Sequence, residues 1–204
     1  MNLKQANWKP TKVALLFTAL GIAPAALAED AGGYFGVSAG HASDSDYCSD
    51  TAGLSVTSCD DSDTSFRVFG GARITPNVGI EAAYVNLGTY TGSVSGFGPA
   101  VRVETELTGF TVQGVGMVPF GNEFSLMGRV GIIFWDLDSS ASPSVASASG
   151  GDDGTDIALG VGAQYKFARN FGLRADFDFY PDLGNSTTGE SDVTAFSIGA
   201  VFSF

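Results

Sequence analysis

Residues 171–180 read FGLRADFDFY, and the character of the side chain changes at every position. Positions 171, 173, 175, 177 and 179 are Phe, Leu, Ala, Phe and Phe, whereas positions 172, 174, 176, 178 and 180 are Gly, Arg, Asp, Asp and Tyr. Successive side chains of a strand point to opposite faces of a sheet, so this pattern predicts a strand with two unlike faces. Residues 156–167 and 192–204 alternate in the same way.

Five further segments alternate less cleanly, which brings the expected total to eight strands. No segment after residue 30 shows a helical period. The expected strands are residues 33–41, 65–74, 78–88, 103–118, 123–137, 156–167, 171–180 and 192–204.

The connections between these strands alternate in length. Short turns are expected at 75–77, 119–122 and 168–170, and long links rich in Ser, Gly and Asp at 42–64, 89–102, 138–155 and 181–191. Short turns at one end and long polar loops at the other are typical of an up-and-down barrel in a bacterial outer membrane. The sequence therefore predicts an all-β, eight-stranded antiparallel transmembrane barrel with both termini at the short-turn end.

A soluble barrel of the lipocalin type is the alternative fold, with apolar residues inside and polar residues outside. The alternate residues that face water in a soluble barrel would be rich in Lys, Glu and Asp. The more polar set of alternate residues here is mostly Gly, Ser and Ala. Small residues suit the narrow lumen of an eight-stranded barrel, which side chains just fill. The composition therefore favours large apolar side chains that face lipid.

The first 28 residues have the features of an export signal. Three lysines precede the apolar stretch 13–22, and the small-residue site Ala26-Leu27-Ala28 follows it. A short membrane anchor is the alternative, but the apolar stretch is too short to span a bilayer. We expect residues 1–28 to be a cleaved signal peptide and residues 29–204 to form the barrel domain.

The charge balance limits the possible partners. The chain has 10 Lys+Arg against 22 Asp+Glu, which argues against a nucleic-acid ligand because few cations are available to neutralise phosphates. Outside the cytoplasm a cysteine pair can stay oxidised. We therefore expect a local disulfide between Cys48 and Cys59, the only two cysteines. A zinc site is the weaker alternative, because two sulfurs without nearby histidine fall short of tetrahedral coordination.

Three stretches carry a resemblance to a known family. FGGARITPNVGIEAAYVNLG at 69–88, GVGMVPFGNEFSLMGRVGIIFWDLD at 114–138 and GVGAQYKFARNFGLRADFDFY at 160–180 are similar to hairpins of the outer-membrane protein A (OmpA) barrel family. The resemblance implies that the last strand, with Phe202 and Phe204, is the signal read by the barrel-assembly machinery. Many members continue into a peptidoglycan-binding domain, and this sequence stops at the eighth strand, so we infer no tether to the cell wall.

Several charged residues fall on the inward parity of their strands. In OmpA-like barrels interior carboxylates and basic groups form ion-pair networks, and the resemblance places Glu81 and Arg174 in such a network. The candidate residues are Glu81, Arg129, Arg174, Asp176 and Asp178, with Arg67 and Lys166 also expected inside. We favour a static paired core over a switchable gate, because buried charges must be paired and a filled small barrel conducts little.

Catalysis is the alternative from a different class, because some eight-stranded outer-membrane barrels modify lipids with Ser, His and an acid. His41 is the one histidine, with Ser43 and Asp44 nearby in the sequence. No nucleophile motif accompanies it, so we expect no enzyme, no cofactor and no metal. The acidic stretches 42–64 and 149–156 could hold divalent cations, but they lack the ligand spacing of a calcium loop, and solvated loop surface is the preferred interpretation.

These observations predict a monomeric outer-membrane barrel with a structural and surface-display role. The expected partners are outer-membrane lipids, lipopolysaccharide and, during biogenesis, the barrel-assembly machinery. A low-conductance solute channel is the main alternative, and the open volume of the lumen would separate the two.

Overall fold

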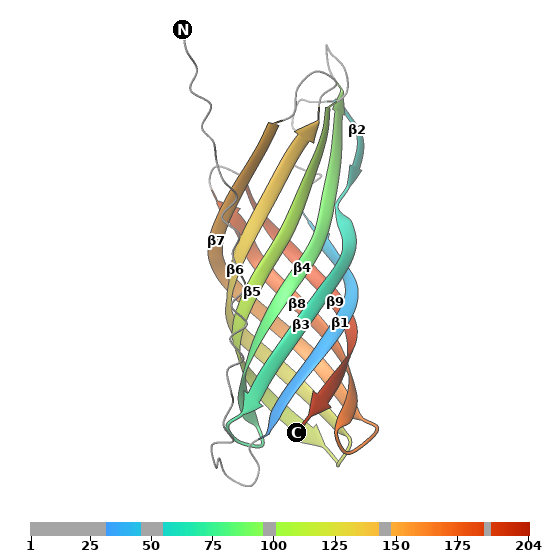
Figure 1. Ribbon diagram of the computed structural model, residues 1–204, viewed down its shortest axis with the longest axis vertical. Coiled ribbons are helices and arrows are strands. Elements are labelled where there is room, and N and C mark those ends of the chain that lie inside the picture. Colours follow the sequence, from blue (N-terminus) through green and yellow to red (C-terminus); the bar gives the residue numbers. More distant parts are fainter. Residues whose placement is uncertain (1–31, 46–54, 96–100, 143–147, 186–188) are drawn as a thin grey trace.

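The computed structural model describes residues 32–45, 55–95, 101–142, 148–185 and 189–204. The expected signal peptide at 1–28 and Cys48 lie outside the described residues. Within them the chain forms nine strands (Figure 1). The strands are β1 (Gly33–Asp44), β2 (Ser55–Asp60), β3 (Ser62–Arg73), β4 (Val78–Ser95), β5 (Val101–Phe120), β6 (Phe124–Ser142), β7 (Ala148–Lys166), β8 (Phe171–Asn185) and β9 (Gly189–Ser203).

The strands close into a barrel, and every pairing between them is antiparallel. β1 pairs with β9 on one side and with β3 on the other, and the β4–β5 pairing completes the circle. The predicted eight-stranded antiparallel barrel is confirmed, and its wall is formed by β1 and β3 to β9. No helix among the described residues is long and apolar enough to cross a membrane.

The three short connections lie at one end of the barrel, which we call the turn end. In the β3–β4 turn the hydroxyl oxygen of Thr75 accepts hydrogen bonds from the backbone N–H groups of Asn77 and Val78, at 3.3 and 3.0 Å. In the β5–β6 turn Gly121 has a φ of 70°, a conformation that favours glycine. The C-terminus lies at the same end (Figure 1), so we call the opposite end the loop end.

The strands at the loop end are longer than the sequence predicted. β6 continues to Ser142 and β7 begins at Ala148, so most of the expected loop 138–155 is a paired hairpin. β2 is a further strand inside the expected loop 42–64, and it pairs with β4. Gly, Ser and Asp have low strand propensity, but backbone hydrogen bonds that continue an existing register do not require favourable side chains.

Along a single strand, the outward side chains change from apolar near the turn end to acidic near the loop end, and the inward side chains change from charged to apolar. On β6 the outward side chains from Phe124 to Phe134 are apolar and exposed, and the inward Arg129 is buried. Beyond Phe134 the outward residues are Asp136 and Asp138, and the inward Trp135 is buried. The outward apolar stretch of residues 124–134 matches the roughly 9–11 residues that a strand needs to cross a bilayer.

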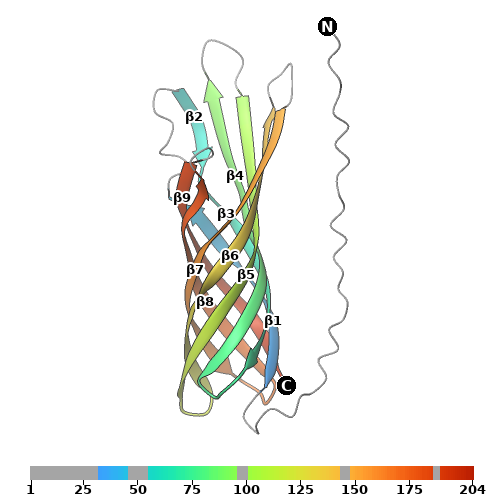
Figure 2. The ribbon, with the colours of Figure 1, turned by 90° about the vertical axis from the view of Figure 1, so that its left-hand side faces the viewer.

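Above this apolar band β4 to β7 continue as a projecting sheet. Figure 2 shows these strands reaching past the end of β9. β6 runs on from residue 134 to Ser142, which corresponds to about 25 Å at the usual rise per residue. From Ile133 upward the inner surface is an apolar layer, formed by Leu87, Tyr90, Leu107, Ile133, Trp135, Tyr180, Leu183 and Val193.

Candidate functional site

All five candidate charged residues lie in the barrel lumen and are buried. Arg174 and Glu81 are each 1% exposed, and Arg129, Asp176 and Asp178 are at most 3% exposed. Each comes from a strand in which the neighbouring residues on either side point outward, which is how the alternation places it inside. Arg67 on β3, 4% exposed, joins them.

These six side chains form a closed ring of alternating charges. Arg174 donates to both oxygens of Glu81, with Nη1–Oε2 at 2.6 Å and Nη2–Oε1 at 3.0 Å. Arg67 bridges from Glu81 to Asp178, with Nη2–Oε1 at 2.6 Å and Nη1–Oδ2 at 2.9 Å. The ring therefore joins β3, β4 and β8 in its first half.

Arg129 on β6 completes the ring. Its Nη2 donates to Oδ1 of Asp178 at 2.8 Å, and its Nη1 donates to Oδ1 of Asp176. The Nε of Arg174 donates to the same Asp176 oxygen at 2.9 Å. Every guanidinium thus lies between two carboxylates, so three positive charges balance three negative ones, which is the arrangement that buried charges need.

Neutral and aromatic residues support the ring, and the sequence did not single them out. The hydroxyl of Tyr34 donates to Oε2 of Glu81 at 3.0 Å. Gln113 accepts a hydrogen bond from Arg67 at 3.3 Å. The ring of Phe69 lies under the guanidinium of Arg174, with 4.4 Å from Cζ to the ring centroid. Inward parity was the available signal for all three, but parity alone does not say which inward residues meet.

A small cavity lies between the charged ring and the apolar layer above it. The cavity lined by Arg67, Asp178 and Tyr180 has a volume of about 10 Å³. A water molecule needs roughly 10–15 Å³ of such volume.

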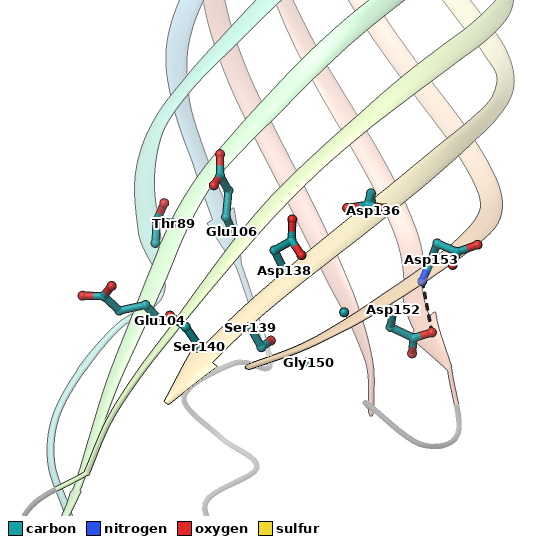
Figure 3. A pocket seen from close by; sticks show the side chains of 11 residues that line it. Thr89, Glu104, Glu106, Asp136, Asp138, Ser139, Ser140, Gly150, Asp152 and Asp153 are labelled. Atoms are coloured by element: carbon teal, nitrogen blue, oxygen red, sulfur yellow. Dashed lines mark hydrogen bonds between the residues drawn. The ribbon is translucent and has the colours of Figure 1, made fainter. Parts of the chain in front are cut away.

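The outer face of the projecting sheet carries a second charged site. An open hollow of about 970 Å³ lies over β5, β6 and β7, and Figure 3 shows its side chains. No basic residue is among its described lining residues. Its outward carboxylates are Glu104, Glu106, Asp136, Asp138 and Asp153, and it is also lined by Asp152, which has the inward parity of β7.

Some of these carboxylates stand directly opposite one another. Glu106 is the cross-strand partner of Asp138, and Asp136 is the partner of Asp153. Like charges in such positions destabilise a sheet. Burial is the largest cause that raises the pKa of Asp136 above its usual value, followed by the charges of Asp138 and Asp153. The described residues contain no group of three or more His, Cys, Asp or Glu arranged to hold a metal ion.

The remaining candidate residues lie away from both charged sites. Phe202 packs against Phe35 and Phe171, with ring centroids 5.4 and 5.0 Å apart, and Phe204 is exposed at the turn end. Cys59 lies on β2, and its expected bond to Cys48 stays a prediction. His41 points outward on β1, whereas Asp44 points inward.

Lys166 is the one expected inward charge that takes no part in the ring. It lies at the turn end of β7 and lines a separate cavity with Arg73.

The comparisons with known proteins agree with this architecture. Residues 13–204 match the family model described as "Outer membrane protein beta-barrel domain". No curated protein matches the chain.

Several solved structures share the fold. Neisserial surface protein A (NspA) is 17% identical with a TM-score of 0.56, and the match covers 86% of this chain and all of that one. Ail, the attachment invasion locus protein of Yersinia pestis, is 16% identical with a TM-score of 0.53, covering 85% and 97%. OprG from Pseudomonas aeruginosa is 15% identical with a TM-score of 0.51, covering 84% and 96%. The family match spans the whole barrel, and the chain belongs to the outer membrane protein beta-barrel domain family.

Proposed function

We propose that this protein is a sealed structural barrel of the bacterial outer membrane that displays an acidic sheet at the cell surface. The observation that carries the proposal is the inversion of faces along single strands. Apolar side chains face outward up to Phe134 on β6, and carboxylates face outward beyond it. A carboxylate that faces lipid is costly, so the projecting sheet belongs in water.

The orientation follows from the lengths of the strands. Outer-membrane barrels carry short turns on the periplasmic side and long segments outside. We therefore place the loop end outside the cell and both termini of the barrel in the periplasm. The aromatic cluster around Phe202 then lies at the periplasmic interface of the membrane. There the barrel-assembly machinery would recognise the last strand.

The sealed lumen is supported by two successive layers. The ring of six charged side chains blocks the lumen at the level of the apolar band, and the apolar layer with Ile133 and Trp135 follows it. A low-conductance channel would need a continuous path for water past both. Opening the ring would separate buried charges, which is expensive.

The displayed surface favours a positively charged partner. Residues 148–158 of β7 pair only with β6, because the pairing between β7 and β8 begins at Leu159 and Phe179 and runs toward the turn end. Pro181 follows on β8 and has no N–H to donate to a neighbouring strand. An exposed strand edge can accept an added strand, and the adjoining carboxylates would select an extended cationic polypeptide.

Ail has been solved with the heparin analogue sucrose octasulfate. The acidic hollow of the present chain is unsuited to such a polyanion, because like charges repel.

Catalysis finds no support in the position of His41. A catalytic base must lie within hydrogen-bond reach of its nucleophile and of an orienting acid. His41 and Asp44 are on opposite faces of β1.

A conductance measurement tests the sealed barrel. The refolded mature protein is inserted into planar lipid bilayers, and current is recorded in KCl. We expect no stable conductance steps, because both layers remain closed. Regular steps in the unmodified protein would overturn the sealed barrel and establish the channel.

Peptide binding tests the displayed surface. The probe is an extended peptide of alternating Lys and Val, and a second copy carries N-methyl groups on alternate backbone nitrogens. We expect the triple variant Glu106→Gln, Asp138→Asn, Asp153→Asn to bind the peptide at least tenfold more weakly. The matched control Glu123→Gln, an exposed acid at the turn end, should bind as the wild type does.

The N-methylated peptide separates the two components of this binding. It cannot donate a full ladder of hydrogen bonds to β7, so we expect it to bind more weakly than the parent peptide at equal charge. Equal binding of both peptides would contradict strand addition. Equal binding by the triple variant would contradict the acidic face as the site.

A further inference from the structure

The turn end of the lumen contains a small cavity that the charged ring does not fill. Its volume is about 210 Å³, and its wall includes Tyr34, Arg73, Met127, Gln164 and Lys166. The hydroxyl of Tyr34 is already bonded to Glu81, so the ring forms the inner limit of the cavity. A ligand would enter from the turn end.

The described residues that line the cavity include two cations and no acid. Within the ring three arginines balance three carboxylates, so the ring supplies no spare anion. None of the described residues that line the cavity is acidic. Arg73 and Lys166 therefore add two positive charges that repel each other.

Two carboxylates of described residues near the turn end pair with neither cation. The backbone N–H of Lys166 donates to the carbonyl oxygen of Glu123 at 2.7 Å, but their side chains form no ion pair. The carboxyl end of Phe204 and the guanidinium of Arg73 both lie close to Gly32. They too form no ion pair among the described residues.

The cavity offers several hydrogen-bond donors, and one buried donor has no acceptor among the described residues. Nε of Arg73 is buried without a hydrogen-bond partner, as are Nε of Arg67 and Nε of Arg129 in the ring, and leaving such a donor unpaired is costly. The ammonium of Lys166 and the side-chain amide of Gln164 add further donors on β7. Arginine and lysine together are a common donor set for phosphate oxygens.

We propose that this cavity binds a doubly charged phosphate, either free inorganic phosphate or the end of a phosphate monoester. Two negative charges would neutralise Arg73 and Lys166 together, whereas a carboxylate or a phosphodiester would leave one cation unpaired. A phosphate monoester carries close to two charges at neutral pH. The site is independent of the surface proposed above for cationic partners, because it lies at the opposite end of the barrel.

The experiment uses the refolded mature protein in maltoside micelles, which contain no phosphate. Inorganic phosphate is titrated in, and the backbone amide NMR signals of Gln164 and Lys166 are followed. Sodium chloride at matched ionic strength is the reference titration. We expect saturable shifts with phosphate and only small linear shifts with chloride.

Variants test the assignment to the two cations. Arg73→Gln and Lys166→Gln should each weaken phosphate binding at least tenfold, because each removes one of the two charges. Arg169→Gln removes an exposed cation from the neighbouring turn and should leave the affinity within twofold. Unchanged electrophoretic heat-modifiability would show that each variant still forms the barrel.

Several outcomes decide the proposal and the source of the phosphate. Equal shifts with chloride, or equal weakening by Arg169→Gln, would overturn the site. Saturation by inorganic phosphate supports the free ion, and much tighter binding of glycerol phosphate supports a monoester. Binding seen only with phosphatidylglycerol in the micelles would overturn the doubly charged ligand, because that headgroup is a phosphodiester.

Discussion

Arg174 on β8 donates hydrogen bonds to both carboxylate oxygens of Glu81 on β4, in a bidentate salt bridge with N–O distances of 2.6 and 3.0 Å. The two residues are 93 positions apart in the chain. Two parallel hydrogen bonds of this kind are stronger and more directional than a single contact. The pair ties opposite parts of the barrel wall together through the lumen.

The first prediction concerns the energy of this pair. Glu81→Gln or Arg174→Met alone should each destabilise the barrel by about 3–5 kcal/mol, because each leaves a buried charge without its partner. The double variant should cost less than the sum of the two. Urea unfolding in lipid vesicles gives the coupling energy, and a value near zero would show that the pair is not energetically linked.

The apolar layer offers a matched pair of neighbouring residues. Ile133 points inward and is fully buried, whereas Ile132 points outward and is 41% exposed. Ile133→Ala leaves a cavity, but lipid can fill the space left by Ile132→Ala. We expect Ile133→Ala to cost at least about 1 kcal/mol more, on the scale of a cavity contribution. Equal free energies of unfolding for the two variants would contradict an ordered apolar layer.

Acidic pH should relieve repulsion in the projecting sheet. The pKa of Asp136 is raised by burial and by its acidic neighbours, so the folded sheet binds its proton more readily than the unfolded chain. Ionised Asp136 therefore destabilises the sheet above its folded pKa, and this cost disappears as the pH falls below its unfolded pKa.

Asp136→Asn should accordingly slow amide hydrogen exchange in β6 at pH 7. The gain should be about 0.5 kcal/mol, which is typical of like charges on neighbouring strands. At pH 3 the variant and the wild type should exchange alike. Ser140→Ala, on the same outward face, serves as a control without a charge change.

The Cys48–Cys59 disulfide should be dispensable for the barrel. Cys59 lies on β2, which pairs with β4 at the loop end and is not part of the barrel wall. Closing this short loop restricts the unfolded chain by about 2–3 kcal/mol, but the other strand pairings remain after reduction. Mass spectrometry of the alkylated protein measures the bond, and alkylation of both cysteines in untreated protein would contradict it.

Boiling should change the migration of the protein in detergent gels. A closed barrel has no free edge within the apolar band, and its backbone groups there are paired, so detergent alone should not unfold it. We expect unheated samples to run at a different apparent mass from boiled ones. Identical migration, together with the absence of a β-rich circular dichroism spectrum, would contradict the closed barrel.

Alternation within single strands, together with the alternating lengths of the connections, predicted the barrel and placed its charged residues in the lumen. Phe177 and Asp178 differ in parity, and the period of two places one toward lipid and the other inside without reference to any other strand. The short turns were also predictable, because residues such as Pro76 and Gly121 interrupt strands locally. These features depend on the chain over only a few residues.

Features that depend on register required the tertiary structure. The sequence placed Arg67, Arg129 and Arg174 inside, but only strand pairing determines the height of each along the lumen and therefore their closed ring with three carboxylates. The same holds for Glu106 opposite Asp138, and for Arg73 beside Lys166. The strands also continue into the stretches of Gly, Ser and Asp at the loop end because neighbouring backbones supply the hydrogen bonds there. Local patterns thus determined which face each side chain takes, whereas contacts between distant strands decided which side chains meet.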